Sequence, residues 1–381
     1  MDNTLYNSLY KTHKETSLSG RYIRLVDIQP LINKLPSFFK VDVIGQSVLG
    51  KNIHSITFGS GSKKVLMWSQ MHGNESTTTK AIFDMLNVIA DGGLVSILEA
   101  CTIKIIPMLN PDGSEAYTRL NANQVDLNRD AQQLSQPESN VLKHCFEAFK
   151  PDFCFNLHGQ RTMYSVSNTN NTATLSFLSP SEDKERSITT TRKKAMEIIA
   201  SINNVLQLDL PNQIGRYDDG FNINCVGDTF QSLKSPTVLF EAGHYKDDYQ
   251  REEVRGFVFK SLLVALNCIS STTVSGSYYK DYLKIPENGK QFYDIIIRKA
   301  QFNDQILDIG INYEEKLIDN TIKFIPKVMI IDNLSQFFGH KELNANNRKV
   351  YASNGKVISQ GTENDFVTIN NEELSLNLSD S

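Results

Sequence analysis

The sequence predicts an α/β fold in which a mixed, mostly parallel sheet is flanked by helices, followed by a smaller C-terminal β-rich domain. Over roughly the first 270 residues, short apolar runs of strand length alternate with segments of helical periodicity, which is typical of α/β layers. Several of the apolar runs lead directly into polar clusters, as strands do where an open sheet carries a binding site. Beyond Ser271, short β-like runs separated by turn residues take over.

The first domain can be followed element by element. Its apolar runs predict a hairpin and then strands, at 41–46, 52–59, 65–71, 102–109, 152–158 and 237–243. Amphipathic or capped segments predict helices at 75–90, 137–149, 183–203 and 250–268. The Asp91-Gly92-Gly93 sequence is a stop signal, and Pro137 suits the first turn of a helix.

The stretch at 270–277 has the small polar residues of a linker. We therefore expect one domain over residues 1–272 and a second, β-rich domain of unknown role over 276–381. Its β-like runs lie at 278–285, 291–300, 321–331 and 348–358.

Composition narrows the function classes. The 381 residues are 40% hydrophobic and 22% charged, which excludes a disordered or collagenous chain. The formal charge of -4 gives no basic excess for nucleic acid or anionic lipid, so we expect neither partner. We see neither a signal peptide nor a membrane span, and the five scattered cysteines form no CxxC pair. We therefore expect a cytoplasmic protein with reduced thiols.

Three residues at predicted strand ends are candidate metal ligands. His72 and Glu75 follow the strand at 65–71, and His158 ends the strand at 152–158. Two imidazoles and a carboxylate are zinc ligand types, and a catalytic zinc takes three protein ligands and a water. Taken alone, the His-x-x-Glu spacing is common, and it fits equally a capping Glu beside a partly buried His.

Two further features accompany this set. Glu241 ends the strand at 237–243, where an acid is costly to bury unless it is paired or functional. Arg119 and Arg129 lie among amides in a loop after a strand, which suits recognition of a carboxylate or an oxyanion. Each of these residues also fits an ordinary salt bridge.

Together these motifs resemble the zinc metallocarboxypeptidases, the carboxypeptidase A-like, M14-type group. The resemblance covers about residues 20–270. Within this group, the chain resembles a bacterial member that carries an extra C-terminal domain. It is carried by six elements in order: His72-Gly73-Asn74-Glu75, Asn110-Pro111-Asp112-Gly113, Arg119, Asp126-Leu127-Asn128-Arg129, His158 and Glu241.

The resemblance implies a hydrolase with one Zn²⁺ ion. His72, Glu75 and His158 match the family's zinc ligands. Asp126 matches a carboxylate that accepts a hydrogen bond from the first histidine ligand and fixes its tautomer.

The resemblance also implies roles around the metal. Glu241 matches the general base, and Arg119 matches the cation that polarises the scissile carbonyl. Asn128 and Arg129 match the pair that binds the substrate's terminal carboxylate. Tyr217 resembles the family's mobile tyrosine, although an ordinary loop tyrosine is equally compatible with its position.

The implied reaction removes a C-terminal amino acid from a peptide with a free carboxylate. The related aspartoacylase and succinylglutamate desuccinylase group, which hydrolyses N-acyl amino acids and carries a C-terminal β domain, is the alternative. A binding module without activity is a third reading, but such relatives typically lose a ligand or the base. Gly159-Gln160 stands where many digestive members have Ser after the third ligand, so the specificity is left open, as is the oligomeric state.

Overall fold

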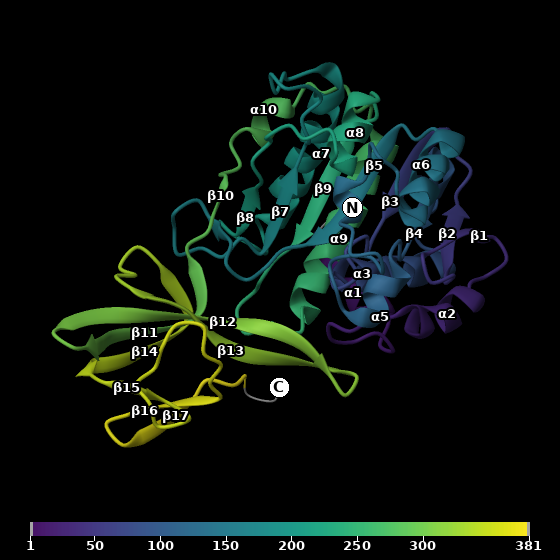
Figure 1. Ribbon diagram of the computed structural model, residues 1–381. Helices are drawn as coiled ribbons and strands as arrows, with labels where there is room; N and C mark the ends of the chain where they lie inside the picture. Colours follow the sequence, from purple (N-terminus) through teal and green to yellow (C-terminus); the bar gives the residue numbers. More distant parts are fainter. Residues whose placement is uncertain (1–2, 379–381) are drawn as a thin grey trace. The chain divides into compact units, whose positions relative to one another are not determined.

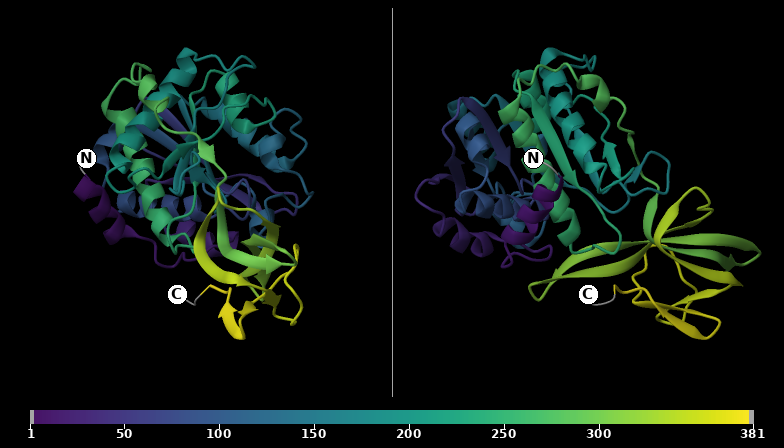
Figure 2. Two further views of the ribbon diagram at one scale, coloured as in Figure 1. Left: turned by 90° about the vertical axis from the view of Figure 1, so that its left-hand side faces the viewer. Right: turned by 180° about the vertical axis from the view of Figure 1, so that it is seen from behind.

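The computed structural model describes residues 3–378 and divides the chain into two compact units. The first contains the described residues up to Gln160 together with Ala173–Asn288, and the second contains Arg161–Thr172 and the described residues from Gly289 onward. Each unit can be followed in Figure 1 and, from two further sides, in Figure 2. The division at 288/289 lies later than the predicted linker at 270–277.

An eight-stranded mixed sheet forms the centre of the first unit, with the order β1-β2-β4-β3-β5-β9-β7-β8. Parallel pairing joins β4, β3, β5 and β9, and antiparallel pairing joins β1 to β2, β2 to β4 and β9 to β7. The strands are β1 (Lys40–Gln46), β2 (Asn52–Phe58), β3 (Lys63–Trp68), β4 (Cys101–Ile106), β5 (Phe153–Gly159), β7 (Leu175–Leu178), β8 (Ile214–Arg216) and β9 (Thr237–Ala242). This confirms the predicted mixed, mostly parallel sheet.

Helices cover both faces of this sheet (Figure 1). The helices are α1 (Asn3–His13), α2 (Leu25–Asn33), α3 (Thr77–Ala90), α4 (Val95–Ala100), α5 (Pro111–Ala116), α6 (Pro137–Phe149), α7 (Thr190–Leu206), α8 (Val226–Ser232), α9 (Glu252–Ser271) and α10 (Tyr279–Tyr282), with the 3-10 turn η1 (Leu127–Arg129). One apolar core joins the sheet to α1, α2, α3, α7 and α9, and a second joins its other face to α6 and α8.

Helix α9 is the longest of these helices, at 20 residues. Its length and hydropathy would suffice to cross a membrane, yet 67% of that window is buried inside the protein. It packs against α3 and α7, so its apolar surface is explained by the core of the first unit.

Local chemistry explains where the predicted helices begin. Pro137 starts α6 as predicted. The helix predicted from 183 begins instead at Thr190, because the Thr189 side chain accepts a hydrogen bond from the Arg192 N–H (3.2 Å) and caps it there.

The segment at 278–285 differs from its predicted β structure. It contains α10, which packs against α7 in the first unit. Tyr282 is buried there. Alternating aromatic and polar residues fit a strand as well as one short helical turn, and burial of Tyr282 against the first unit decides between them.

The second unit is β-rich, as predicted. A four-stranded sheet has the order β13-β12-β11-β14, and a three-stranded sheet has the order β15-β16-β17. Apolar residues of both sheets form a common core. The strands are β11 (Phe292–Phe302), β12 (Gln305–Ile318), β13 (Thr321–Asp332), β14 (Phe338–Arg348), β15 (Val350–Ala352), β16 (Phe366–Ile369) and β17 (Glu372–Ser375); the short β6 (Ser165–Val166) precedes them, and β10 (Asn288–Gly289) lies where the chain passes between the units.

Candidate active site

The candidate site lies where three parallel strands of the first unit end. His158 is the penultimate residue of β5, and Glu241 is the penultimate residue of β9. The register of the two strands places them directly opposite each other. His72 follows β3, the neighbour of β5 on its other side. These residues are up to 169 positions apart in the sequence. They come together because β3, β5 and β9 are parallel neighbours whose carboxyl ends lie at one edge of the sheet.

A tight turn after β3 positions His72 and Glu75. Gln70 has a left-handed backbone (φ 44°), and its buried side chain donates to the Gly73 carbonyl (2.8 Å). A side chain at Gly73 would place its Cβ 2.0 Å from the Gly113 carbonyl carbon. Glycine is therefore required at this position, because the backbone of the turn meets the backbone of α5 there.

His72, Glu75 and His158 offer ligand atoms that all lie within 4.8 Å of one another. The Nδ1 atoms of the two histidines are 3.1 Å apart, and Glu75 reaches each with one carboxylate oxygen, at 2.8 Å and 2.9 Å. Both histidines are buried, at 2% exposure. Among residues 3–378, these three residues are the one set of His, Cys, Asp or Glu side chains found close enough together to hold a metal ion.

Asp126 contacts His72 at the ring nitrogen that faces away from Glu75. Its Oδ1 lies 3.0 Å from His72 Nε2, so a proton on Nε2 leaves Nδ1 free as a ligand atom. Burial opposes protonation of His72, but the Glu75 and Asp126 carboxylates outweigh burial and raise its pKa. The pKa of Asp126 is held below its usual range, because hydrogen bonding and charge from His72 and the charge of Arg119 outweigh burial.

The surroundings shift the pKa values of Glu75 and Glu241 in opposite directions. Burial would raise the pKa of Glu75, but the two adjacent histidines hold it well below the ordinary range. The pKa of Glu241 is raised well above its ordinary value, first by burial and then by the Glu75 charge, despite Arg119. An acid whose pKa is raised beside an ionised acid is the arrangement expected of a proton-transferring group.

Arg119 lies at the rim of the group. Its guanidinium is 3.3 Å from Glu75 Oε1 and 3.0 Å from Asp126 Oδ2, and its side chain is 44% exposed. With five N–H donors and this exposure, it can contact a bound molecule while it remains beside the carboxylates.

Asn128 and Arg129 occupy the 3-10 turn that follows Asp126. The Asn128 N–H donates to Asp126 Oδ1 (2.9 Å), and its side-chain oxygen accepts from the Val226 N–H (3.1 Å). These contacts hold the turn between the ligand group and α8. Arg129 is exposed, and its Nη1 donates to the Asn128 carbonyl (2.9 Å). The structure therefore brings both residues to the same end of the sheet as the ligand group.

A network of buried polar side chains stabilises the loop around η1. The sequence analysis did not single out this network. Asn121 donates to Gln136 (2.8 Å) and Glu138 (3.1 Å), while Asp130 accepts from the Ser135 and Gln136 N–H groups. The concentration of amides and acids in this loop was the available signal, because such residues commonly bond to nearby backbone.

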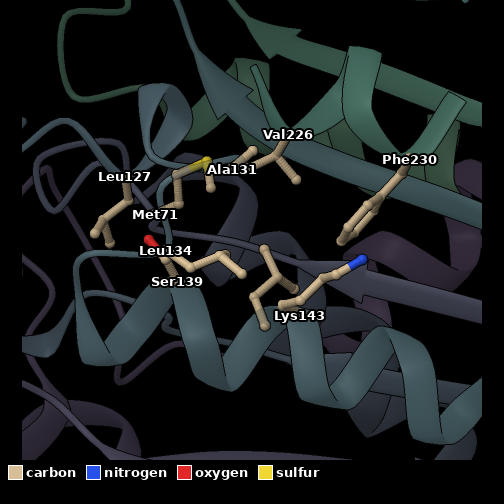
Figure 3. A pocket seen from close by; sticks show the side chains of 9 residues that line it. Met71, Leu127, Ala131, Leu134, Ser139, Lys143, Val226 and Phe230 are labelled. Carbon is tan, nitrogen blue, oxygen red and sulfur yellow. The ribbon is translucent and has the colours of Figure 1, made fainter. Parts of the chain in front are cut away.

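An apolar pocket lies behind η1, between α6 and α8 (Figure 3). Its empty volume is about 260 Å³, including the part open to solvent. The residues that line it are Met71, Leu127, Ala131, Leu134, Ser139, Leu142, Lys143, Val226 and Phe230. None of the candidate ligands lines it, so the pocket is a neighbour of the site and does not contain it.

Tyr217 is placed differently from the other candidates. The register pairs Glu241 with Ser176 and Ser176 with Gly215, and β7 and β8 both run antiparallel to β9. The chain at Tyr217 therefore continues away from the sheet end that carries His158. The sequence separation from Glu241 suggested this tyrosine, but it could not show that β8 runs in the opposite direction. Its substrate-binding role stays a prediction.

The donor set fits a zinc ion. Two imidazole nitrogens and one carboxylate converge, the carboxylate is held in its ionised form, and Asp126 supports one histidine. The fold and site thus define a class: an α/β protein with a group of side chains that could hold a metal ion at the carboxyl end of its sheet.

Comparisons with known proteins narrow that class. Residues 26–182 match the sequence model of a family described as zinc carboxypeptidase. This match agrees with the resemblance to the zinc carboxypeptidases given by the motifs.

Curated relatives match over shorter stretches. Carboxypeptidase E of Caenorhabditis elegans is 28% identical over 148 residues, 31% of this chain and 31% of that protein. Gamma-D-glutamyl-L-diamino acid endopeptidase 1 of Lysinibacillus sphaericus is 33% identical over 97 residues, 23% of this chain and 24% of that protein. The matches thus span less than a third of these relatives.

Solved structures agree with the fold. The crystal structure of carboxypeptidase A from Helicoverpa armigera superposes with a TM-score of 0.53 at 15% identity, covering 71% of this chain and 80% of that one. At this identity, the likeness is evidence for the fold alone.

Proposed function

We propose that this protein is a zinc-dependent carboxypeptidase that removes the C-terminal residue from peptides with a free carboxylate. The observation that carries the proposal is the convergence of His72, Glu75 and His158, which all lie within the stretch that matches the zinc carboxypeptidase family. Glu241, beyond that stretch, lies opposite His158.

Zinc held by His72, Glu75 and His158 would polarise the scissile carbonyl and lower the pKa of a bound water toward about 7. The ionised Glu75 and the tautomer of His72 favoured by Asp126 prepare these residues for a cation.

Glu241 is the proposed general base. Its raised pKa makes it a stronger proton acceptor than an ordinary carboxylate. In the proposed reaction, its carboxylate takes the proton from the attacking water and passes it to the leaving amine. Its position opposite His158, on the neighbouring strand, keeps it beside the ligand group.

Arg119 is proposed to bind the oxygen of the substrate's scissile carbonyl, and Arg129 is proposed to bind its terminal carboxylate. Arg119, at the rim of the ligand group, would donate to the oxygen on which negative charge develops. The exposed Arg129, with Asn128 beside it, would bind the terminal carboxylate and so restrict cleavage to the chain end.

Peptides are favoured over N-acyl amino acids as substrates, because the family match and the named carboxypeptidase relative both fall on the peptidase side. The match to a bacterial endopeptidase acting on gamma-D-glutamyl bonds supports including cell-wall-type peptides among the substrates tested.

The test uses the purified full chain. Zinc is removed with a chelator and restored, and dipeptides, tripeptides, gamma-D-glutamyl peptides and N-acyl amino acids are assayed in each state. We expect zinc-dependent release of C-terminal amino acids from the peptides. Cleavage confined to N-acyl amino acids would favour the deacylase alternative. Binding of peptides by the zinc-loaded protein without any cleavage would indicate a binding module.

A further inference from the structure

A buried arginine joins the two strand ends that carry His158 and Glu241. Arg251, at 2% exposure, donates from one guanidinium nitrogen to the Ala242 carbonyl and from another to the Gln160 carbonyl, both at 3.0 Å. Ala242 directly follows Glu241, and Gln160 lies two residues after His158. The same guanidinium thus contacts the backbone of β9 and the backbone just beyond β5.

The two strand ends also contact each other at this point. The Gln160 N–H donates to the Ala242 carbonyl (2.9 Å), so this carbonyl accepts from both Gln160 and Arg251. One residue earlier, the Gly159 N–H donates to Glu75 Oε2 (2.9 Å). The backbone that Arg251 holds is therefore continuous with the backbone that orients a candidate metal ligand.

Arg251 is itself held firmly. It has a left-handed backbone (φ 60°) at the start of α9, a conformation that costs free energy in a residue other than glycine. Its N–H donates to the Asp248 carbonyl (3.2 Å). The Asp248 carboxylate accepts from three N–H groups of the first turn of α9, at 2.7–2.9 Å. The guanidinium is thus delivered to the strand ends from a capped helix.

We propose that Arg251 is a positioning residue, which fixes Glu241 relative to His158 by joining the ends of β9 and β5. The inference rests on the proposed function, because it assumes that Glu241 acts beside ligands on β5. A planar guanidinium with donors in a fixed fork suits two carbonyls on separate strands, whereas a lysine ammonium is a single point of charge.

The test compares Arg251→Lys with Arg255→Lys. Arg255 is the matched control, because it is also buried, lies one turn further along α9, and bonds to Asp84 and to the carbonyls of Leu18 and Glu15 instead of the strand ends. Thermal unfolding sets a temperature at which both variants are folded. There, kcat and KM are measured on a cleaved peptide, zinc content is determined, and hydrogen exchange is followed at the Gln160 amide.

We expect Arg251→Lys to lower kcat about 10- to 100-fold with KM within about threefold, since small misplacements of reacting groups carry such penalties. The Gln160 amide should exchange about tenfold faster or more, and one zinc per chain should remain. Arg255→Lys should lower the unfolding temperature and leave kcat and Gln160 exchange close to wild type. If Arg251→Lys only lowered stability, as Arg255→Lys is expected to do, kcat and Gln160 exchange would not change.

Equal kcat and equal Gln160 exchange in the two variants would overturn the proposal. If the wild-type protein cleaves no peptide, the proposed function fails, whereas the exchange measurement still tests whether Arg251 holds the strand ends. If Arg251→Lys does not fold, Asp248→Asn replaces it, because an amide offers one acceptor oxygen where the carboxylate offers two. A smaller decrease in kcat with faster Gln160 exchange is then expected, and unchanged values of both would overturn the proposal.

Discussion

His158 and Glu241 lie directly opposite each other on the neighbouring parallel strands β5 and β9. One belongs to the buried group of candidate metal ligands, and the other is an acid whose pKa is raised well above its ordinary value. Adjacent strands in a sheet are about 4.8 Å apart, so the register alone brings the acid next to the ligand group. The first prediction follows from the different roles proposed for these two residues, metal ligand for His158 and general base for Glu241.

Glu241→Gln should retain one zinc per chain and lose about 10²- to 10⁴-fold in kcat, the usual contribution of general acid–base catalysis. The amide keeps the shape of the side chain and cannot accept the proton. Metal content by elemental analysis and kcat on a cleaved peptide check this prediction. Loss of zinc from the variant would instead identify Glu241 as a ligand.

Arg129→Ala should raise KM for peptides with a free C-terminal carboxylate about 10- to 100-fold, because a charge-assisted hydrogen bond contributes about 1.5–3 kcal/mol. Binding of C-terminally amidated peptides, measured as inhibition constants, should change little. Arg186→Ala is the control, as Arg186 is also an exposed arginine (51%) and pairs with Asp218 and Asp219. An equal effect on free and amidated peptides would contradict the proposed carboxylate recognition.

Asp126→Asn should weaken zinc binding about 10- to 100-fold, the usual effect of removing a carboxylate behind a histidine ligand. The physical reason is that an amide no longer stabilises the His72 tautomer whose Nδ1 is free. Competition with a chelator measures the affinity, and Asp218→Asn, at an exposed loop position, serves as the control. An unchanged zinc affinity would show that Asp126 does not support His72 in this way.

Much of the sheet could be predicted because its strands are short apolar runs that end in polar residues. The α6 helix matches its predicted range of 137–149, since Pro137 marks the start and an apolar face follows. The motif residues around His72 and His158 also came together as predicted, because the ends of neighbouring parallel strands lie at one edge of the sheet.

Other features depend on contacts that no local pattern encodes. Arg251 could not be singled out, since its partners are backbone carbonyls whose positions follow from the fold. Tyr217 was chosen by sequence separation, and the antiparallel direction of β7 relative to β9 carries it away. The helix α10 forms where a strand was predicted, because Tyr282 is buried in the first unit.

The last prediction concerns the pH dependence of stability. Glu252 bonds to Lys14 (2.8 Å) and to the buried Lys80 (2.5 Å). Burial opposes its ionisation, but these cations and Arg255 lower its pKa from 4.5 to about 2. The unfolded chain therefore binds a proton more readily than the folded one between these values. This part of the free energy of unfolding is fully present above about pH 5, and it is lost as the pH falls toward 2.

Glu252→Gln should thus lower the free energy of unfolding at pH 7 by up to about 3 kcal/mol, the equivalent of that pKa difference. The gap between variant and wild type should narrow on acidification and nearly close at pH 2. Urea unfolding at several pH values measures it, and Glu253→Gln, at the exposed neighbouring position, is the control. A gap that stays constant between pH 7 and pH 2 would mean that the variant acts by changing packing around Lys80 and not by removing the ionised carboxylate.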